Sequence, residues 1–115
     1  MFKEQEKLER AVMEMILIHK NDPDGIYLNQ YLNSQILSRE FTGVGFFTKF
    51  IIPESLIISS ESKDIAEVTA TFKDSDIILL FILFIGNGKL DCLEGVVSHE
   101  CWRYDYENLQ LQYRT

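Results

Sequence analysis

The sequence from Ile77 to Ile85 reads IILLFILFI, and the next four residues, 86–89, read GNGK. A run of nine apolar residues is too short for a membrane helix, which needs about 20. Its β-branched and aromatic side chains instead predict a strand buried on both faces. Asn87 and Gly88 tolerate the positive φ angles of a tight hairpin. We therefore expect a central strand that turns and returns antiparallel.

The segments around this run have the periodicity of a β-sheet. Residues 90–97 follow the hairpin and form the expected return strand. Residues 66–72 alternate Ala, Val and Phe with Glu and Thr, which is typical of a strand with one face in water. Residues 44–52 are rich in aromatic and β-branched side chains and end at Pro53, and residues 109–114 alternate Leu and Tyr with Gln and Arg. The sequence thus predicts about five strands, mostly antiparallel.

The N-terminal part of the chain has helical periodicity instead. Residues 3–20 place apolar side chains on one face of a helix, and the expected buried stripe comprises Leu8, Ala11, Val12, Met15 and Ile18. Residues 21–25, Asn-Asp-Pro-Asp-Gly, stop this helix, because proline cannot continue it and an aspartate can cap the next. A second helix is expected over residues 26–38. The predicted fold class is α+β: a single domain, residues 1–115, with an N-terminal two-helix hairpin packed on the sheet.

The chain is acidic, and the excess charge is unevenly placed. It has 18 Asp and Glu against 11 Lys and Arg, a formal net charge of −7. Residues 1–20 are balanced, whereas residues 91–115 carry a net charge of −3. An acidic domain repels phosphate backbones, so we expect no direct nucleic-acid binding. The same charge attracts a basic protein and accelerates the encounter with it.

The N-terminus and the cysteines favour a cytoplasmic location. The chain begins Met-Phe-Lys-Glu-Gln-Glu-Lys, a charged, helix-forming stretch rather than a signal peptide. Cys92 and Cys101 could pair, but a reducing compartment with both thiols free is the simpler interpretation. No apolar run is long enough for a membrane helix, so we expect no membrane partner.

Three short motifs suggest ligands but lack the pattern that each ligand requires. Residues 43–45, Gly-Val-Gly, follow a predicted helix and open a strand, the reverse of a dinucleotide site, and we expect Gly43 to end the helix. Residues 22–25 lack the distal carboxylate of a calcium loop. Residues 99–101, His-Glu-Cys, together with Cys92, lack the closely spaced cysteines of zinc sites. We also find no signature of a nucleophile beside a base, and we predict no metal, no cofactor and no enzymatic activity.

Candidate partner-binding residues lie between positions 91 and 107. Glu94 stands inside a predicted strand between apolar residues, where a carboxylate is either held by a hydrogen bond or ion pair, or available to a partner. Residues 102–107 combine acids with Trp, Tyr and Arg, which are enriched at interfaces; the alternative is an aromatic lid over one end of the sheet. The predicted binding residues are Asp91, Glu94, Glu100, Trp102, Tyr104, Asp105, Tyr106 and Glu107.

Two stretches carry a resemblance to a known family. The first is residues 42–48, Thr-Gly-Val-Gly-Phe-Phe-Thr; the second is residues 83–95, with Leu-Phe-Ile at 83–85 and Gly-Lys-Leu-Asp-Cys-Leu-Glu-Gly at 88–95. They resemble a family of small bacterial proteins that pairs Thr-Gly-x-Gly-Phe-Phe-Thr with Leu-Glu-Gly-Tyr; Val96 replaces the Tyr here. The similarity covers roughly residues 40–113. In size, charge and class, the chain also resembles immunity proteins of contact-dependent growth inhibition. This resemblance implies a protein that binds a cognate toxin domain, often a basic nuclease, and blocks its active site.

Two hypotheses from different classes follow from these features. The first is an immunity protein that occludes the active site of a basic toxin domain. The second is a small-molecule-binding or regulatory domain, in which a concave sheet with Phe47, Phe50 and Trp102 holds an apolar ligand. An exposed sheet edge would in addition allow a weak homodimer or the addition of a partner strand.

Overall fold

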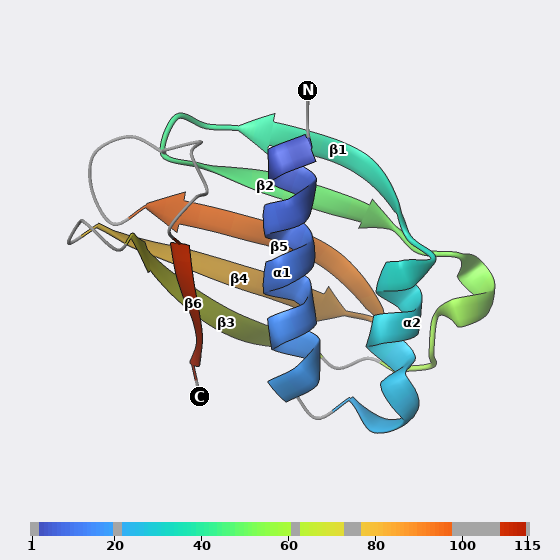
Figure 1. Cartoon of the computed structure of the whole chain (residues 1–115). Coiled ribbons are helices and arrows are strands. Elements are labelled where there is room, and N and C mark those ends of the chain that lie inside the picture. The colour runs from blue at the N-terminus through green and yellow to red at the C-terminus, as the bar shows by residue number, and fades with distance from the viewer. Residues whose placement is uncertain (1–2, 20–21, 61–62, 73–76, 98–108, 115) are drawn as a thin grey trace.

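The computed structural model describes residues 3–19, 22–60, 63–72, 77–97 and 109–114 (Figure 1). In chain order its elements are α1 (Lys3–His19), the 3-10 turn η1 (Pro23–Gly25), α2 (Ile26–Leu32), β1 (Gln35–Phe41), β2 (Gly45–Ile51), the 3-10 turn η2 (Glu54–Leu56), β3 (Lys63–Phe72), β4 (Ile78–Gly86), β5 (Lys89–Val97) and β6 (Leu109–Arg114). The strands form one six-stranded sheet in the order β1-β2-β5-β4-β3-β6, with every neighbouring pair antiparallel. Both α-helices lie on one face, which we call the inner face; the opposite face is the outer face. The predicted α+β class is confirmed, with six strands rather than about five.

The apolar run that suggested the fold forms the middle of the sheet, as predicted. β4 pairs with β3 on one side and β5 on the other. On the inner face Leu79, Phe81 and Leu83 are fully buried. Asn87 and Gly88 have φ angles of 55° and 78°, the positive values that a tight hairpin turn requires. The expected hairpin therefore joins β4 to β5.

The second helix is shorter than predicted. It ends at Leu32 instead of continuing to Ser38. The Asn33 side-chain amide donates to the Asn29 carbonyl at 2.9 Å, and the Ser34 hydroxyl donates to the Tyr31 carbonyl at 2.7 Å. These bonds satisfy carbonyls that the end of a helix leaves without partners. They allow α2 to end at Leu32 and β1 to begin at Gln35.

The residues beyond this point form β1, a strand that the sequence did not reveal. β1 pairs with β2 only and is one edge of the sheet, while β6 is the other. Gly43, which we expected to end a helix, lies in the turn between β1 and β2 with a φ angle of +85°. The strand-pairing energy of β1 with β2 outweighs the helical pattern of its side chains, as tertiary context often does.

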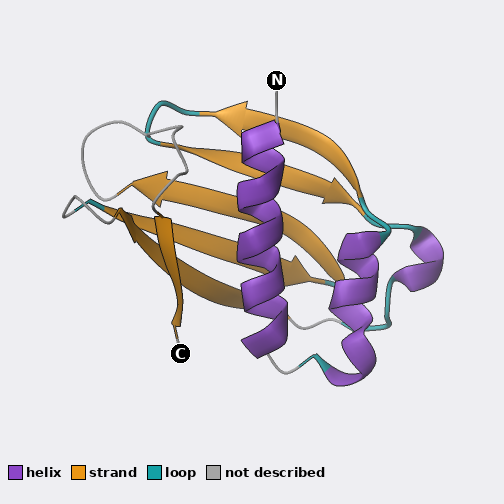
Figure 2. Cartoon of the chain, viewed as in Figure 1, coloured by secondary structure: helices purple, strands orange, loops and turns teal. Residues whose placement is uncertain are grey.

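The long helix α1 crosses the strands of the inner face (Figure 2). Its buried apolar residues are Leu8, Val12, Met13, Ile16 and Leu17. Ile18, predicted to be buried, is 77% exposed, and Ala11 is exposed as well. The helix is rotated because Gln5 and Glu9 are also buried against the sheet. Among the described residues, no helix is both long and apolar enough to span a membrane.

Candidate functional site

The two stretches that carry the family resemblance are neighbours in the sheet. Phe46 on β2 lies opposite Gly95 on β5. A Cβ atom added to Gly95 would lie 2.3 Å from Cε1 of Phe46, and one added to Gly45 would lie 1.8 Å from the Gly95 carbonyl oxygen. Only glycine allows these approaches. The glycines of the two stretches are thus a packing requirement, and they allow β2 to pair with β5 with Phe46 on the inner face.

The outer face of the sheet is apolar at its centre. Residues that pair across antiparallel strands point to the same side of the sheet. The central outer-face side chains are half-buried and comprise Phe47, Leu80, Ile82, Phe84 and Val96. Around them Ile51, Ile65 and Ile78 are 44%, 55% and 47% exposed. Both α-helices of the described chain lie on the inner face, so neither covers these side chains (Figure 2). Contiguous apolar surface is a common feature of interaction sites.

Carboxylates interrupt this apolar centre in one line across the strands. We call Glu40, Glu94 and Glu67, on β1, β5 and β3, the carboxylate row; Phe47 and Ile82 lie between them in the register. Glu94 is half-buried, and within the described chain its carboxylate has no hydrogen-bond or ion-pair partner. The described residues therefore supply neither the hydrogen bond nor the ion pair of the first alternative for Glu94, and a role in binding stays a prediction. The sequence did not indicate the row, because it depends on the strand order.

Asp91, the other described candidate, occupies a bulge in β5. Leu90 pairs with Ile85 and Cys92 with Phe84, which leaves Asp91 without a partner in the ladder. Its exposed side chain lines an open pocket of about 740 Å³ beside the β4–β5 hairpin.

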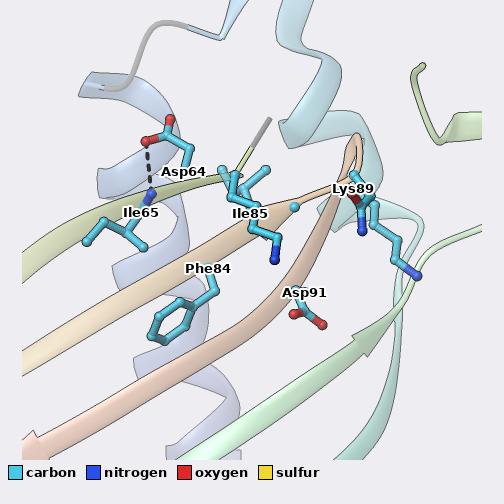
Figure 3. A pocket seen from close by; sticks show the side chains of 9 residues that line it. Asp64, Ile65, Phe84, Ile85, Lys89 and Asp91 are labelled. Atoms are coloured by element: carbon cyan, nitrogen blue, oxygen red, sulfur yellow. Dashed lines mark hydrogen bonds between the residues drawn. The ribbon is translucent and has the colours of Figure 1, made fainter. Parts of the chain in front are cut away.

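The pocket has an apolar floor and a charged rim. Figure 3 shows Phe84 and Asp91 on adjacent strands, with Lys89 at the hairpin. The lining residues are Lys63, Asp64, Ile65, Phe84, Ile85, Gly86, Asn87, Lys89 and Asp91. The two lysines balance the two aspartates, and Asp64 Oδ1 accepts a hydrogen bond of 2.8 Å from the Ile65 N–H. The pocket therefore extends the outer face with mixed charges and does not enclose an apolar ligand.

The remaining predicted binding residues lie outside the described part of the chain. They are Glu100, Trp102, Tyr104, Asp105, Tyr106 and Glu107. The candidate metal ligands His99 and Cys101 lie outside it too. The binding role predicted for this segment stays a prediction. The outer-face site consists of strand residues alone.

The aromatic pair proposed to hold a small molecule is split between the two faces. Phe47 lies on the outer face, whereas Phe50 is buried on the inner face, where its ring meets the edge of Tyr31 at a centroid distance of 6.1 Å. Residues three apart in a strand point to opposite sides of the sheet. The expectation that Phe47 and Phe50 line one concave site is therefore wrong.

A buried carboxylate on the inner face has a very different environment. Glu9 on α1 is 3% exposed. Its Oε1 accepts a bond of 2.7 Å from Arg39 Nη2, and its Oε2 accepts bonds from Arg39 Nε at 2.9 Å, Gln5 Nε2 at 2.9 Å and Thr48 Oγ1 at 2.6 Å. The hydrogen bond to Glu9 raises the pKa of Arg39 above its ordinary value. This network ties α1 to β1 and β2, and the sequence gave no signal for a contact between residues so far apart.

A second buried polar side chain, Gln30, joins three segments. Its Nε2 donates to the carbonyls of Leu56 and Gly88 at 3.0 and 2.9 Å, and its Oε1 accepts from the Leu90 N–H at 2.9 Å. Gln30 is fully buried. One carboxamide thus bonds three backbone groups, of which the Gly88 carbonyl also accepts from the Ile58 N–H at 3.1 Å, and it attaches α2 to the β4–β5 hairpin.

Cys92 is a free, buried thiol. Burial, followed by the charge of Asp91, raises its pKa from 9.0 to about 11. Reactive cysteines have a lowered pKa and an accessible sulfur. Cys92 has neither property, so it acts as a small apolar residue of the sheet.

The described residues hold no candidate metal cluster. None of their His, Cys, Asp and Glu side chains form a group of three or more that could hold a metal ion. An open pocket of about 570 Å³ between α1, α2 and β1 contains Glu9, Arg39 and Tyr31. There the Glu9 carboxylate accepts hydrogen bonds from four donor atoms, and burial raises the pKa of Tyr31 above its ordinary value.

Comparisons with protein-family models, with curated proteins and with solved structures gave no match. Function is therefore inferred from the geometry and chemistry of this chain.

Proposed function

We propose that this chain is an immunity protein: a non-enzymatic inhibitor that binds a cognate bacterial toxin domain, a basic nuclease, through its outer face and thereby covers the toxin's active site. The observation that carries the proposal is an apolar sheet face that neither α-helix of the described chain covers. At its centre lies the Glu94 carboxylate, which has no hydrogen-bond or ion-pair partner among the described residues. Stable interfaces combine an apolar core with a more polar rim. The central side chains of the outer face supply such a core, and the charged rim of the hairpin pocket borders it.

Glu94 gives this surface its selectivity. Closing an interface over a half-buried carboxylate removes water from it, and an unpaired buried charge costs several kcal/mol. A partner must therefore present Lys or Arg at this position, while partners without a cation are rejected. A nuclease provides such cations, because its active-site groove binds phosphates. Glu94 then takes the place of a phosphate in that groove.

The net charge of −7 supports the same kind of partner. Opposite net charges steer two proteins toward each other and raise the association rate, an effect that falls as salt increases. An inhibitor that must reach a toxin before the toxin reaches nucleic acid benefits from a fast association. The cytoplasmic location expected from the sequence belongs to this proposal, since it is where a nuclease toxin acts.

The test uses the C-terminal domain of the large secreted protein encoded immediately upstream, where such a gene is present. We expect the chain to restore growth of cells that express this domain and to bind it in isothermal titration calorimetry. Glu94→Lys should weaken binding at least about 100-fold, since a like charge then lies at the interface centre. Glu54→Lys, which changes an exposed carboxylate of η2 by the same charge, should leave it within about threefold.

Two results would contradict the proposal. One is the absence of binding to that domain by a folded chain. The other is equal loss of affinity in Glu94→Lys and Glu54→Lys, which would indicate bulk attraction without an outer-face site. Loss in Glu94→Lys alone, with a salt dependence that decreases in the variant, supports it.

The second hypothesis, a small-molecule-binding or regulatory domain, has weaker support. The larger pocket is open and lined by four charged residues. Ligand sites usually enclose most of the ligand in an apolar wall. We therefore keep partner binding as the proposed function.

A further inference from the structure

The spacing of the carboxylate row specifies more than a basic partner. Glu40, Glu94 and Glu67 lie on every second strand, because β2 and β4 stand between them. Neighbouring strands are about 4.8 Å apart, so adjacent members of the row are about 9.6 Å apart. The intervening positions are filled by Phe47 and Ile82. Acidic and apolar side chains thus alternate along a line perpendicular to the strands.

An α-helix matches this alternation when it lies along the line. Seven helical residues rise about 10.5 Å, and positions three or four residues along lie on the same face at about half that distance. Basic residues at positions i and i+7 can therefore meet Glu40 and Glu94, while apolar residues at i+3 and i+4 meet Phe47. A strand laid on this face fits poorly, because its repeat on one side is about 6.7 Å.

The inner face already holds a helix in this orientation. α1 runs across the strands (Figure 2), and its buried residues Leu8, Val12 and Ile16 recur every four positions. It also places one charged residue, Glu9, against opposite charge on the sheet. The twist of this sheet therefore accepts a helix that crosses its strands, and a helix on the outer face would complete a three-layer arrangement.

We propose that the element of the partner bound by the outer face is a basic amphipathic helix that lies across the strands, with Lys or Arg at seven-residue spacing opposite Glu40 and Glu94. Apolar residues between these cations contact Phe47 and Ile82. Glu94 forms the central ion pair, since its carboxylate lies between these two side chains and has no other partner in the described chain. The inference rests on the proposed function for the identity of the protein that carries the helix.

The experiment uses the full chain and two synthetic 21-residue helical peptides as probes, a length of about 31 Å. The in-register peptide carries Lys at positions 1, 8 and 15 beside an apolar stripe. The control peptide exchanges these lysines with glutamines of the opposite helix face, which preserves composition, charge and the apolar stripe. Binding is measured by two-dimensional NMR of the ¹⁵N-labelled chain, from the shifts of the Phe47, Ile82 and Glu94 amides.

We expect the in-register peptide to bind at least about tenfold more tightly than the control, because only its lysines face the row. Glu94→Gln should reduce this preference to less than about threefold, while Glu54→Gln should preserve it. Equal binding of the two peptides, or shifts confined to the inner-face amides, would overturn the inference.

Competition with the toxin domain separates the inference from the proposed function. If the domain binds the outer face but the in-register peptide binds no better than the control, the partner uses another element and only the helix inference fails. If the in-register peptide binds as expected but the domain does not compete with it, the helix inference stands and the proposed toxin partner fails.

Discussion

The inner and outer faces of the sheet differ in how many hydrogen bonds they give to a glutamate carboxylate. On the inner face the Glu9 carboxylate accepts four hydrogen bonds and is 3% exposed. On the outer face Glu94 is half-buried among apolar side chains, and the described chain gives it no hydrogen-bond or ion-pair partner. A folded domain satisfies its buried polar groups internally wherever stability alone decides. The difference supports the proposal that the outer face binds a partner, while the inner face serves folding.

The largest expected difference in stability is between alanine substitutions at two adjacent phenylalanines, Phe46 and Phe47. Phe46→Ala should lower the free energy of unfolding by about 3–5 kcal/mol, because it leaves a cavity beside Gly95 in the core. Phe47→Ala on the outer face should cost only about 1 kcal/mol. Urea denaturation followed by circular dichroism measures both. Equal costs would show that the outer face is as closely packed as the inner face.

The two glutamates provide a contrast of intermediate size. Glu9→Gln removes the charge that Arg39 and Thr48 contact and should cost about 2–4 kcal/mol. Glu94→Gln should change stability by less than about 0.5 kcal/mol, because it breaks no hydrogen bond within the described chain. The urea denaturation midpoints of the two variants, compared with that of the wild type, measure both changes in stability. A large loss of stability in Glu94→Gln would assign this residue a folding role in place of a binding one.

Cys92 gives the smallest effect, and it depends on pH. Because the folded-state pKa is raised from 9.0 to about 11, the folded chain favours the protonated thiol. Its contribution to stability is complete below pH 9 and is lost as the pH rises through 11. The difference in unfolding free energy between the wild type and Cys92→Ala should therefore change by about 1–2 kcal/mol between pH 8 and pH 11. A constant difference over this range would mean that the thiol is hydrated in the folded state.

The strands that could be predicted are those in which local pattern and tertiary environment agree. The run in β4, the Asn87-Gly88 turn and the alternation in β3 each indicate their structure without reference to the rest of the chain. β1 could not be predicted, because the sequence of residues 35–41 is compatible with a continued helix until β2 is placed beside it. Strand pairing over a distance then decides between the two.

The candidate site was predictable in part for the same reason. Alternation along β5 singles out Glu94 as a carboxylate beside apolar residues. The line that joins it to Glu40 and Glu67 requires the strand order, which crosses from β2 to β5 and back to β3. The contact between Glu9 and Arg39 likewise joins residues 30 positions apart. Local periodicity contains no information on such pairs.

The carboxamide of Gln30 has a consequence for the order in which the chain folds. α2 has seven residues, which is too few for a helix to persist alone in water. Its attachment to the hairpin joins residues 58 and 60 positions apart, and contacts of such long range form slowly. The short helix α2 should therefore become stable only after the β4–β5 hairpin has formed, although the ribosome synthesises α2 first. In the native state α2 and the β4–β5 hairpin should open as one cooperative unit. The backbone amides of α2 should then exchange hydrogen at the same rate as the amides of the hairpin.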